Sequence, residues 1–443
     1  MENTNEAWFE QEEEQKIDLQ ELSFIELSEK ELDDYSPFEE EIVLEDYDFG
    51  ADVELIRQKE INKVKAIFKK WLSLKDDSFI DVVLMSAISP KLEGDDVWLF
   101  LIAPPGATKT ETLRVFNNKE RFYEVDDLTS ASFVTGLVKD TKSKMKIINN
   151  EGKITRETEN NQRTKIKNAD LDGKVLICKD FTLILNKNAN ERNAILSQLR
   201  NMYDGKFSKK YGTLDEKVDY VAKFGVIFGV TSAIDRYWKS IQILGERFLK
   251  VRIENDRKDA IRQAVKMQGK EKEMRKELNE AVNEFLDKLI IKDIRVTEEQ
   301  ENVLVDWAEA LGILRTPVPM KNSYQEFDFF YKPDTEFATR LVKQLKKLLI
   351  GLTIIHNKDE PDEEEMNMVK KVVFDTIPQD RLDVLRELKK QKGISQEKIS
   401  KNTGIPFGTI SKILEQLEQL KVVETSVGWG NCSIQNEGIL KLI

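Results

Sequence analysis

Three short runs of almost uninterrupted apolar residues constrain the fold of this chain most strongly. They are VWLFLIA at residues 97–103, VLICKDF at residues 175–181 and FGVIFGVTS at residues 224–232. Runs of this length are typical of strands buried on both faces, and such strands belong to parallel sheets covered by helices. The sequence therefore predicts an α/β fold built on a parallel sheet.

The acidic side chains are concentrated at the N-terminus. Residues 1–54 contain 21 acidic and two basic side chains, whereas the remainder carries 67 basic and 60 acidic ones. A mildly basic body behind an acidic segment is common in enzymes that act on nucleic acids. We interpret residues 1–52 as an acidic, largely disordered segment that either aids solubility or masks a basic surface.

The rest of the chain separates into three parts. Apolar residues at helical spacing precede the strand-like runs, so residues 53–254 are expected to form the core, with short N-terminal helices. Residues 255–360 are helical in pattern and highly charged, which predicts a helical lid region. After the acidic connector DEPDEEE, residues 375–443 form a separate small unit.

Residue usage limits the chemistry and the compartment. His356 is the single histidine, so a multi-histidine metal site within one chain is excluded. Cys178 and Cys432 are the only cysteines, which argues against a disulfide scaffold and indicates the reducing cytoplasm. The chain has no 18-residue apolar run and no signal-peptide pattern, so we expect no membrane association.

The segment APPGATKTETLR, Ala103 to Arg114, follows the first strand-like run and has the features of a variant phosphate-binding loop. Against the pattern GxxxxGK[ST], Lys109 and Thr110 are in place, while Ala103 and Thr108 replace the two glycines. The alternative is a proline-glycine turn before a helix. The residues expected to hold ATP are Pro105, Gly106, Ala107, Thr108, Lys109, Thr110 and Glu111.

An oligomeric ATPase of the AAA+ class needs further residues in a fixed order. Asp180 follows the second apolar run, and Thr231 ends the third, where a polar sensor of the terminal phosphate would stand. Arg247 in LGERF is expected to act as an arginine finger in a neighbouring subunit, and Arg340 as a second sensor. Thr110 and Asp180 are the expected ligands of Mg²⁺.

With these motifs in order, residues 65–360 resemble the minichromosome-maintenance-like helicases of the AAA+ superfamily, especially the shorter versions of phages and mobile elements. LTSASFVTGLVKD at 128–140 is similar to their glycine- and serine-rich helix start, and AILSQLRNMYDGKFSKKYG at 194–212 to their pore hairpin. The resemblance implies a homo-oligomeric ring, with a hexamer as the expected form. It also implies that Lys210, with Lys206 and Lys209 beside it, contacts a single DNA strand.

One position departs from that family. Its second strand normally ends in Asp-Glu, whereas this chain has Lys179-Asp180. This departure keeps open a switch-type AAA+ protein, such as a replication initiator, helicase loader or transposition regulator, that binds DNA without processive unwinding. A third interpretation is a transcriptional regulator with the ATPase core as a scaffold.

Residues 375–443 have the pattern of a winged helix-turn-helix. Helices are expected at 381–391, 395–402 and 407–420, followed by a β-hairpin wing with a Gly-Trp-Gly tip. The residues expected to face the major groove of DNA are Thr409, Ser411 and Lys412. A protein-contact role for this unit is the alternative.

The basic loop at 145–167 is a second, nonspecific candidate for DNA contact. Together these features predict an ATP- and Mg²⁺-dependent DNA helicase or translocase. The family resemblance implies that it acts in the DNA replication of a phage or mobile element.

Overall fold

The computed structural model describes residues 49–106, 108–129, 171–210, 217–237, 247–318, 333–425 and 431–443. For residues 49–59, 206–210, 217–221, 425 and 431 it describes the backbone only. The chain divides into two compact units, Met1–Phe49 and Gly50–Ile443, and the features below belong to the second unit.

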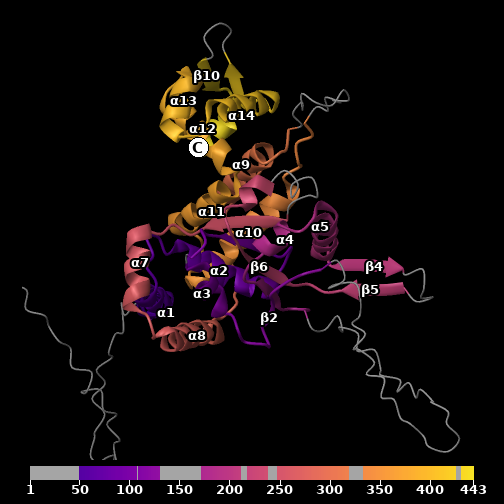
Figure 1. The fold of residues 1–443 in the computed structure, drawn as a ribbon. Coiled ribbons are helices and arrows are strands. Elements are labelled where there is room, and N and C mark those ends of the chain that lie inside the picture. Colours follow the sequence, from indigo (N-terminus) through magenta and orange to yellow (C-terminus); the bar gives the residue numbers. More distant parts are fainter. Residues whose placement is uncertain are drawn as a thin grey trace, which may run out of the picture. The chain divides into compact units, whose positions relative to one another are not determined.

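Five parallel strands form the central sheet, in the order β2-β3-β6-β1-β7 (Figure 1). Their bounds are Trp98–Ile102 for β1, Phe122–Val125 for β2, Val175–Cys178 for β3, Gly225–Val230 for β6 and Phe248–Arg252 for β7. The three apolar runs form the three central strands, and every residue of these strands is buried. The expectation of an α/β fold with a parallel sheet is confirmed.

Each face of the sheet has its own apolar core. Leu99 and Leu101 of β1 point into one core, whereas Trp98, Phe100 and Ile102 point into the other, as the alternation of side chains along a strand requires. Aromatic rings fill the second core, where Phe100 stacks on Phe248 with ring centroids 4.0 Å apart. Burial on both faces therefore explains why the central strands contain so few polar residues.

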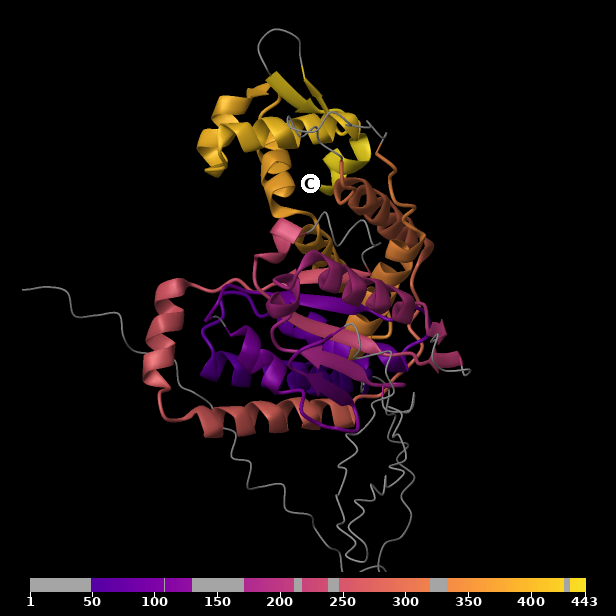
Figure 2. The same cartoon turned by 45° about the vertical axis from the view of Figure 1, so that its right-hand side comes forward.

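Helices pack against both faces of the sheet (Figures 1 and 2). The first core receives side chains from α1 (Phe49–Trp71), α2 (Ser78–Ile88), α3 (Lys109–Arg114) and α8 (Glu271–Lys288). The second core receives side chains from α4 (Thr182–Leu185) and α5 (Ala189–Tyr203). A short 3-10 turn at Ser89–Lys91 leads from α2 towards β1.

The helices after β7 are α7 (Arg257–Lys266), α8, α9 (Glu298–Leu314), α10 (Thr339–Ile355) and α11 (Glu363–Thr376). Capping boxes start two of them: Thr297 with Gln300 begins α9, and Asp362 with Glu365 begins α11. Such caps satisfy backbone N–H groups that the first turn of a helix leaves without partners. Helices α8 to α11 contribute to the first core, whereas α7 has no buried residue.

The C-terminal residues form α12 (Gln379–Lys390), α13 (Gln396–Thr403), α14 (Phe407–Gln419) and α15 (Glu437–Leu442). A three-stranded antiparallel sheet in the order β8-β10-β9 accompanies them, with bounds Ile394–Ser395, Asn431–Ile434 and Val423–Thr425. Gly404 ends α13 with φ of 71°, a left-handed conformation that glycine adopts without strain. The expected Gly-Trp-Gly tip lies outside the described residues.

Among the residues that the structure describes, no helix is both long and apolar enough to cross a lipid bilayer.

Candidate functional site

Three parallel strands bring polar side chains to one edge of the sheet. Thr108 and Lys109 follow β1, Asp180 follows β3 and Thr231 follows β6. The carboxyl ends of parallel strands meet at a common edge, which is where open α/β sheets bind ligands. The structure therefore brings Lys109, Asp180 and Thr231 together at the same edge, as the sequence predicts.

Lys109 is the central group of this edge. Its side chain is almost fully buried, and its Nζ lies 3.9 Å from Oδ1 of Asp180, which is half-exposed. Burial lowers the pKa of Lys109, and the attraction of Asp180 works against that decrease. A buried ammonium with one carboxylate nearby can bind an added anion, because the anion would restore part of the lost solvation.

The loop before Lys109 contains a backbone conformation that favours glycine. Gly106 has φ of 77°, and a Cβ atom there would meet nothing within 4 Å. Glycine is therefore needed for the turn and not for space. The loop residues Pro104, Pro105 and Gly106 are exposed, and Ala107 lies outside the described residues.

Gly229 of β6 has a role that the motif analysis did not identify. A Cβ atom at Gly229 would come within 2.5 Å of the Lys179 carbonyl oxygen and 2.7 Å of Leu113 Cδ1. It would also lie 3.2 Å from Cδ of Lys109. Only glycine leaves room for α3 and the stem of Lys109 to lie against the sheet.

Thr182 is a second residue that the sequence motifs did not indicate. Its backbone N–H donates to Oδ1 of Asp180 at 3.1 Å. Its hydroxyl oxygen accepts from the backbone N–H of Thr231 at 3.1 Å and lies 3.3 Å from the Thr231 hydroxyl. Thr182 thus connects the ends of β3 and β6, a contact that depends on tertiary structure and leaves no local signal.

Lys179 points to a neighbouring strand. It forms an ion pair with Glu124 of β2. Burial and the nearby Arg114 lower its pKa, while Glu111 raises it. The charge of the lysine that replaces an acid in the family pattern is therefore balanced by Glu124. Of the pair Lys179-Asp180, only Asp180 offers a carboxylate to Lys109.

Glu111, expected to contact ATP, is engaged in ion pairs. Its carboxylate accepts from Arg275 of α8 at 2.8 and 3.0 Å and from Arg114 at 2.6 Å. These contacts join α3 to α8. The two threonines of the loop are half-buried, and the hydroxyl of Thr108 accepts from the Asn255 side chain at 3.4 Å. Thr110 lies on the first turn of α3.

The two expected arginines lie near the amino ends of the parallel strands, which we call the amino edge, whereas Lys109 lies at the carboxyl ends. Arg247 directly precedes β7, and a strand of five residues spans about 15 Å. The Arg247 guanidinium is buried and lies 3.4 Å from Asp204. Burial and the nearby Arg340 lower the pKa of Arg247. The structure therefore does not bring Arg247 or Arg340 to the Lys109 edge of the same chain.

Tyr203 lies between the two arginines. The Arg247 and Arg340 guanidinium carbons lie 5.7 and 5.9 Å from the centre of its ring. Gln344 of α10 donates to the carbonyl oxygen of Arg247 at 2.7 Å. A pocket of about 480 Å³ is lined here by Tyr203, Arg340 and Lys343. The other charged residues of its lining are Lys223 and three acids, Asp95, Asp96 and Asp204.

The residues expected to contact DNA lie in two other places. Lys206, Lys209 and Lys210 belong to β4 (Lys206–Lys210), which forms an antiparallel hairpin with β5 (Lys217–Val221); their side chains lie outside what the structure describes. Ser411 of α14 donates to Gln396 of α13 at 2.8 Å. The glycine- and serine-rich segment at 130–140 and the loop at 145–167 also fall outside the described residues.

Thr409 and Lys412 lie in the first half of α14, where Thr409 is half-buried and Lys412 is exposed. They line a pocket of about 200 Å³ together with Asp235 and Asp380. Burial and the charge of Asp235 raise the pKa of Asp380. This part of the expected DNA-contacting face is therefore next to two acids.

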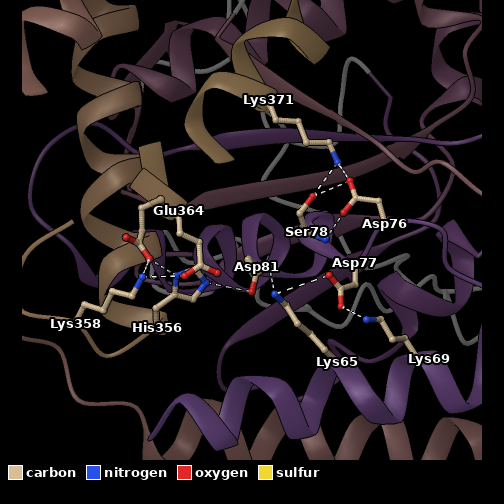
Figure 3. Close-up of polar contacts among 11 residues, drawn as sticks. Lys65, Lys69, Asp76, Asp77, Ser78, Asp81, His356, Lys358, Glu364 and Lys371 are labelled. Atoms are coloured by element: carbon tan, nitrogen blue, oxygen red, sulfur yellow. Dashed lines mark hydrogen bonds and ion pairs between the residues drawn. The ribbon is translucent and has the colours of Figure 1, made fainter. Parts of the chain in front are cut away.

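A second polar cluster surrounds His356, between α2 and the start of α11 (Figure 3). The ring contacts Glu365 at 2.5 Å through Nδ1 and Asp81 at 3.3 Å through Nε2. His356, Glu364 and Glu365 could in principle ligate a metal. The Lys358 ammonium, however, lies 2.7 to 2.8 Å from Glu365 and Glu364, so a cation already lies among these carboxylates. We interpret this cluster as an ionic link between helices.

No protein-family model matches the chain, and no curated protein matches it in sequence.

Proposed function

We propose that this chain is an AAA+ ATPase that assembles into a ring and acts on DNA as a helicase or translocase in the replication of a phage or mobile element. The observation that carries the proposal is the convergence of Lys109, Asp180 and Thr231 at the carboxyl edge of the parallel sheet, directly after the exposed Pro-Pro-Gly loop. A phosphate loop needs a lysine, an acidic residue and a polar sensor at such an edge, and this need is what supports the proposal.

The residues of this edge match the needs of phosphoryl transfer, in which positioning and charge stabilisation dominate. Lys109 would hold the terminal phosphates, because its buried ammonium has Asp180 as a neighbour at 3.9 Å and directly follows a loop whose residues 104–106 are exposed. Thr231 would sense the terminal phosphate through its contact with Thr182. Thr110 and Asp180 offer the oxygen ligands that Mg²⁺ prefers, and the ion would neutralise phosphate charge when bound.

A site shared between subunits is the way in which the two arginines would act, with Arg247 leaving its buried contact with Asp204. Arg247 and Arg340 lie at the amino edge of the sheet, so they cannot reach the Lys109 edge of their own chain without unfolding the strands between. In a head-to-tail ring two different surfaces of neighbouring subunits meet, so the amino edge of one sheet would lie against the carboxyl edge of the next. An arginine from the neighbour would then stabilise the charge of the transition state.

The DNA-contacting parts would be the β4–β5 hairpin and the C-terminal unit. The hairpin carries Lys206, Lys209 and Lys210, which suit sequence-independent contact with phosphates. Helices α12 to α14 with the β8-β10-β9 sheet have the order of elements of a winged helix-turn-helix.

Hydrolysis of ATP by the wild type and by Lys109→Ala, each with and without single-stranded DNA, tests the proposal. We expect turnover that requires Lys109 and increases with DNA. Turnover that is equal in the two proteins would contradict the phosphate-loop assignment. Lys210→Ala should then abolish strand displacement while ATP hydrolysis persists, and Lys272→Ala, at an exposed position on α8, is the matched control.

A switch-type AAA+ protein is the second candidate function. The observation that favours it is the Lys179–Glu124 ion pair, because the acid that normally accompanies Asp180 in the family pattern is replaced by a lysine bound to β2. Such a protein would assemble when it binds ATP but would turn over slowly. ATP-dependent assembly with little hydrolysis, and with no strand displacement by the wild type, would favour the switch.

A further inference from the structure

The connection between α11 and the C-terminal helices is attached to the edge strand β7. Helix α11 ends at Thr376 and α12 begins at Gln379, so only two residues connect them. We call these two residues, together with the last two of α11, the 375–378 joint. The backbone N–H of Arg252 donates to Oδ2 of Asp375 at 2.9 Å, and that of Lys250 donates to the Thr376 hydroxyl at 3.0 Å. An edge strand leaves N–H groups without strand partners, and here the end of α11 satisfies two of them.

The Arg252 side chain joins this 375–378 joint to the segment after β6. Its two terminal nitrogens donate to the two oxygens of Asp235 at 2.9 and 2.8 Å, while Nε donates to the carbonyl oxygen of Asp375 at 3.3 Å. The paired contact with Asp235 is the strong, directional geometry of arginine and carboxylate. One planar guanidinium therefore binds both segments at once.

Asp235 is rigidly connected to Thr231. The backbone N–H of Ile234 donates to the Thr231 carbonyl at 3.1 Å, and that of Asp235 donates to the Ser232 carbonyl at 3.1 Å. Only three residues thus separate the proposed phosphate sensor, Thr231, from Asp235, whose carboxylate holds Arg252. A shift of Thr231 would be passed to Asp235 through this hydrogen-bonded turn.

The end of β7 also touches the proposed phosphate loop. The backbone N–H of Ile253 donates to the carbonyl oxygen of Ile102, the last residue of β1, at 2.9 Å. The Asn255 side chain donates to the Thr108 hydroxyl at 3.4 Å. The segment from Lys250 to Asn255 therefore contacts the 375–378 joint through Lys250 and Arg252, and the Lys109 edge through Ile253 and Asn255.

We propose that Arg252 is a positioning residue that couples the occupancy of the Lys109 edge to the 375–378 joint, and through it to helices α12 to α14. This inference rests on the proposed function, because the bound group that moves Thr108 and Thr231 is a nucleotide. The two acids beside Thr409 and Lys412 include Asp235 itself, so a displacement of Asp235 changes the surroundings of the start of α14. The C-terminal unit would thus present this helix differently in the two nucleotide states.

Hydrogen exchange of the full chain, with and without a slowly hydrolysed ATP analogue, tests the coupling. We expect the analogue to change the exchange rate of peptides that cover the 375–378 joint by about fivefold or more, the lower range of coupling between sites. Arg252→Gln and Asp235→Asn should remove this response while the analogue still binds. Arg252→Lys should also remove it, because an ammonium keeps the charge but cannot bridge both segments.

Arg262→Gln is the matched control. Arg262 of α7 pairs with Asp259 at 3.0 Å on the exposed surface, away from the joint. This variant should keep the full response. Thermal unfolding of each variant identifies loss of folding, and Asp235→Asn tests the contact from the other side if Arg252→Gln proves unstable.

The outcomes separate the two proposals. Analogue binding by the wild type with no change at the joint would overturn the coupling and leave the ATPase proposal intact. A folded Arg252→Gln protein that keeps the response would also overturn it. A wild type that does not bind the analogue would overturn the proposed function and, with it, the coupling.

Discussion

The ammonium of Lys109 and the carboxylate of Asp180 lie 3.9 Å apart, although they follow two different strands that are not adjacent in the sheet. Strand β6 lies between β1 and β3. Its Gly229 leaves the space through which the lysine stem and the end of β3 approach each other. Lys109 and Asp180 therefore come close because of the strand order and because Gly229 has no side chain.

Asp180→Asn should keep ATP binding and lose turnover. The amide cannot supply the negative charge that the proposed metal site needs, so hydrolysis should fall by about 10²- to 10³-fold, the usual cost of removing one stabilising group from a reaction centre. Binding of a fluorescent ATP analogue and steady-state hydrolysis measure the two effects. Asp306→Asn, at an exposed position of α9, is the control and should match the wild type.

Gly229→Ala should destabilise the fold and weaken nucleotide binding together. The added methyl group would overlap the Lys179 carbonyl and Leu113, and overpacking of this kind costs about 1–3 kcal/mol. Gly408→Ala is the matched control on α14, where a Cβ atom would meet nothing within 4 Å. That change should stabilise the protein by about 0.5–1 kcal/mol, because alanine is the better helix former. Chemical denaturation measures both, and equal effects would contradict the packing argument.

Mixed subunits test the placement of Arg247. Lys109→Ala and Arg247→Ala should each be inactive alone. In an equimolar mixture about one quarter of head-to-tail interfaces combine an intact Lys109 with an intact Arg247, so part of the ATPase activity should return. Mixing Lys109→Ala with the double variant should restore nothing. If the first mixture stays inactive although the subunits assemble, Arg247 does not complete a neighbour's site.

Stability above neutral pH should depend on His356. Burial alone would lower the pKa of this ring, but hydrogen bonds with Asp81 and Glu365 outweigh burial and raise the pKa to about 9. The pKa in the unfolded chain is the lower one, about 6.5. The stabilisation from the charged ring is therefore complete below pH 6.5 and lost as pH rises through 9, and it amounts to at most about 3 kcal/mol.

His356→Gln provides the comparison. At pH 6 the free energy of unfolding of the variant should be about 3 kcal/mol lower than that of the wild type, because two buried carboxylates lose a charged partner. The gap should shrink as pH rises from 6.5 to 9.5. Denaturant unfolding at several pH values measures it, and a gap independent of pH would show that His356 is uncharged in the folded chain.

The central strands could be predicted from the sequence, but the edge strands could not. The central strands β3, β6 and β1 are apolar throughout because both of their faces are buried. β2 (FYEV) and β7 (FLKVR) lie at the two edges of the sheet, and their polar residues interrupt the apolar pattern. Their sequences therefore carry a weaker signal, although four of the five residues of β7 are buried.

The sequence by itself determined local features: where the buried strands run, where the Pro-Pro-Gly turn precedes Lys109, and that Asp180 and Thr231 follow strands. Chain order and apolar periodicity suffice for these, because they depend on neighbouring residues. Only the tertiary structure decided that β6 separates β1 from β3, and that Thr182, Gly229 and Arg252 take part. It alone placed Arg247 at the edge opposite Lys109, since strand order and direction arise from packing between distant segments.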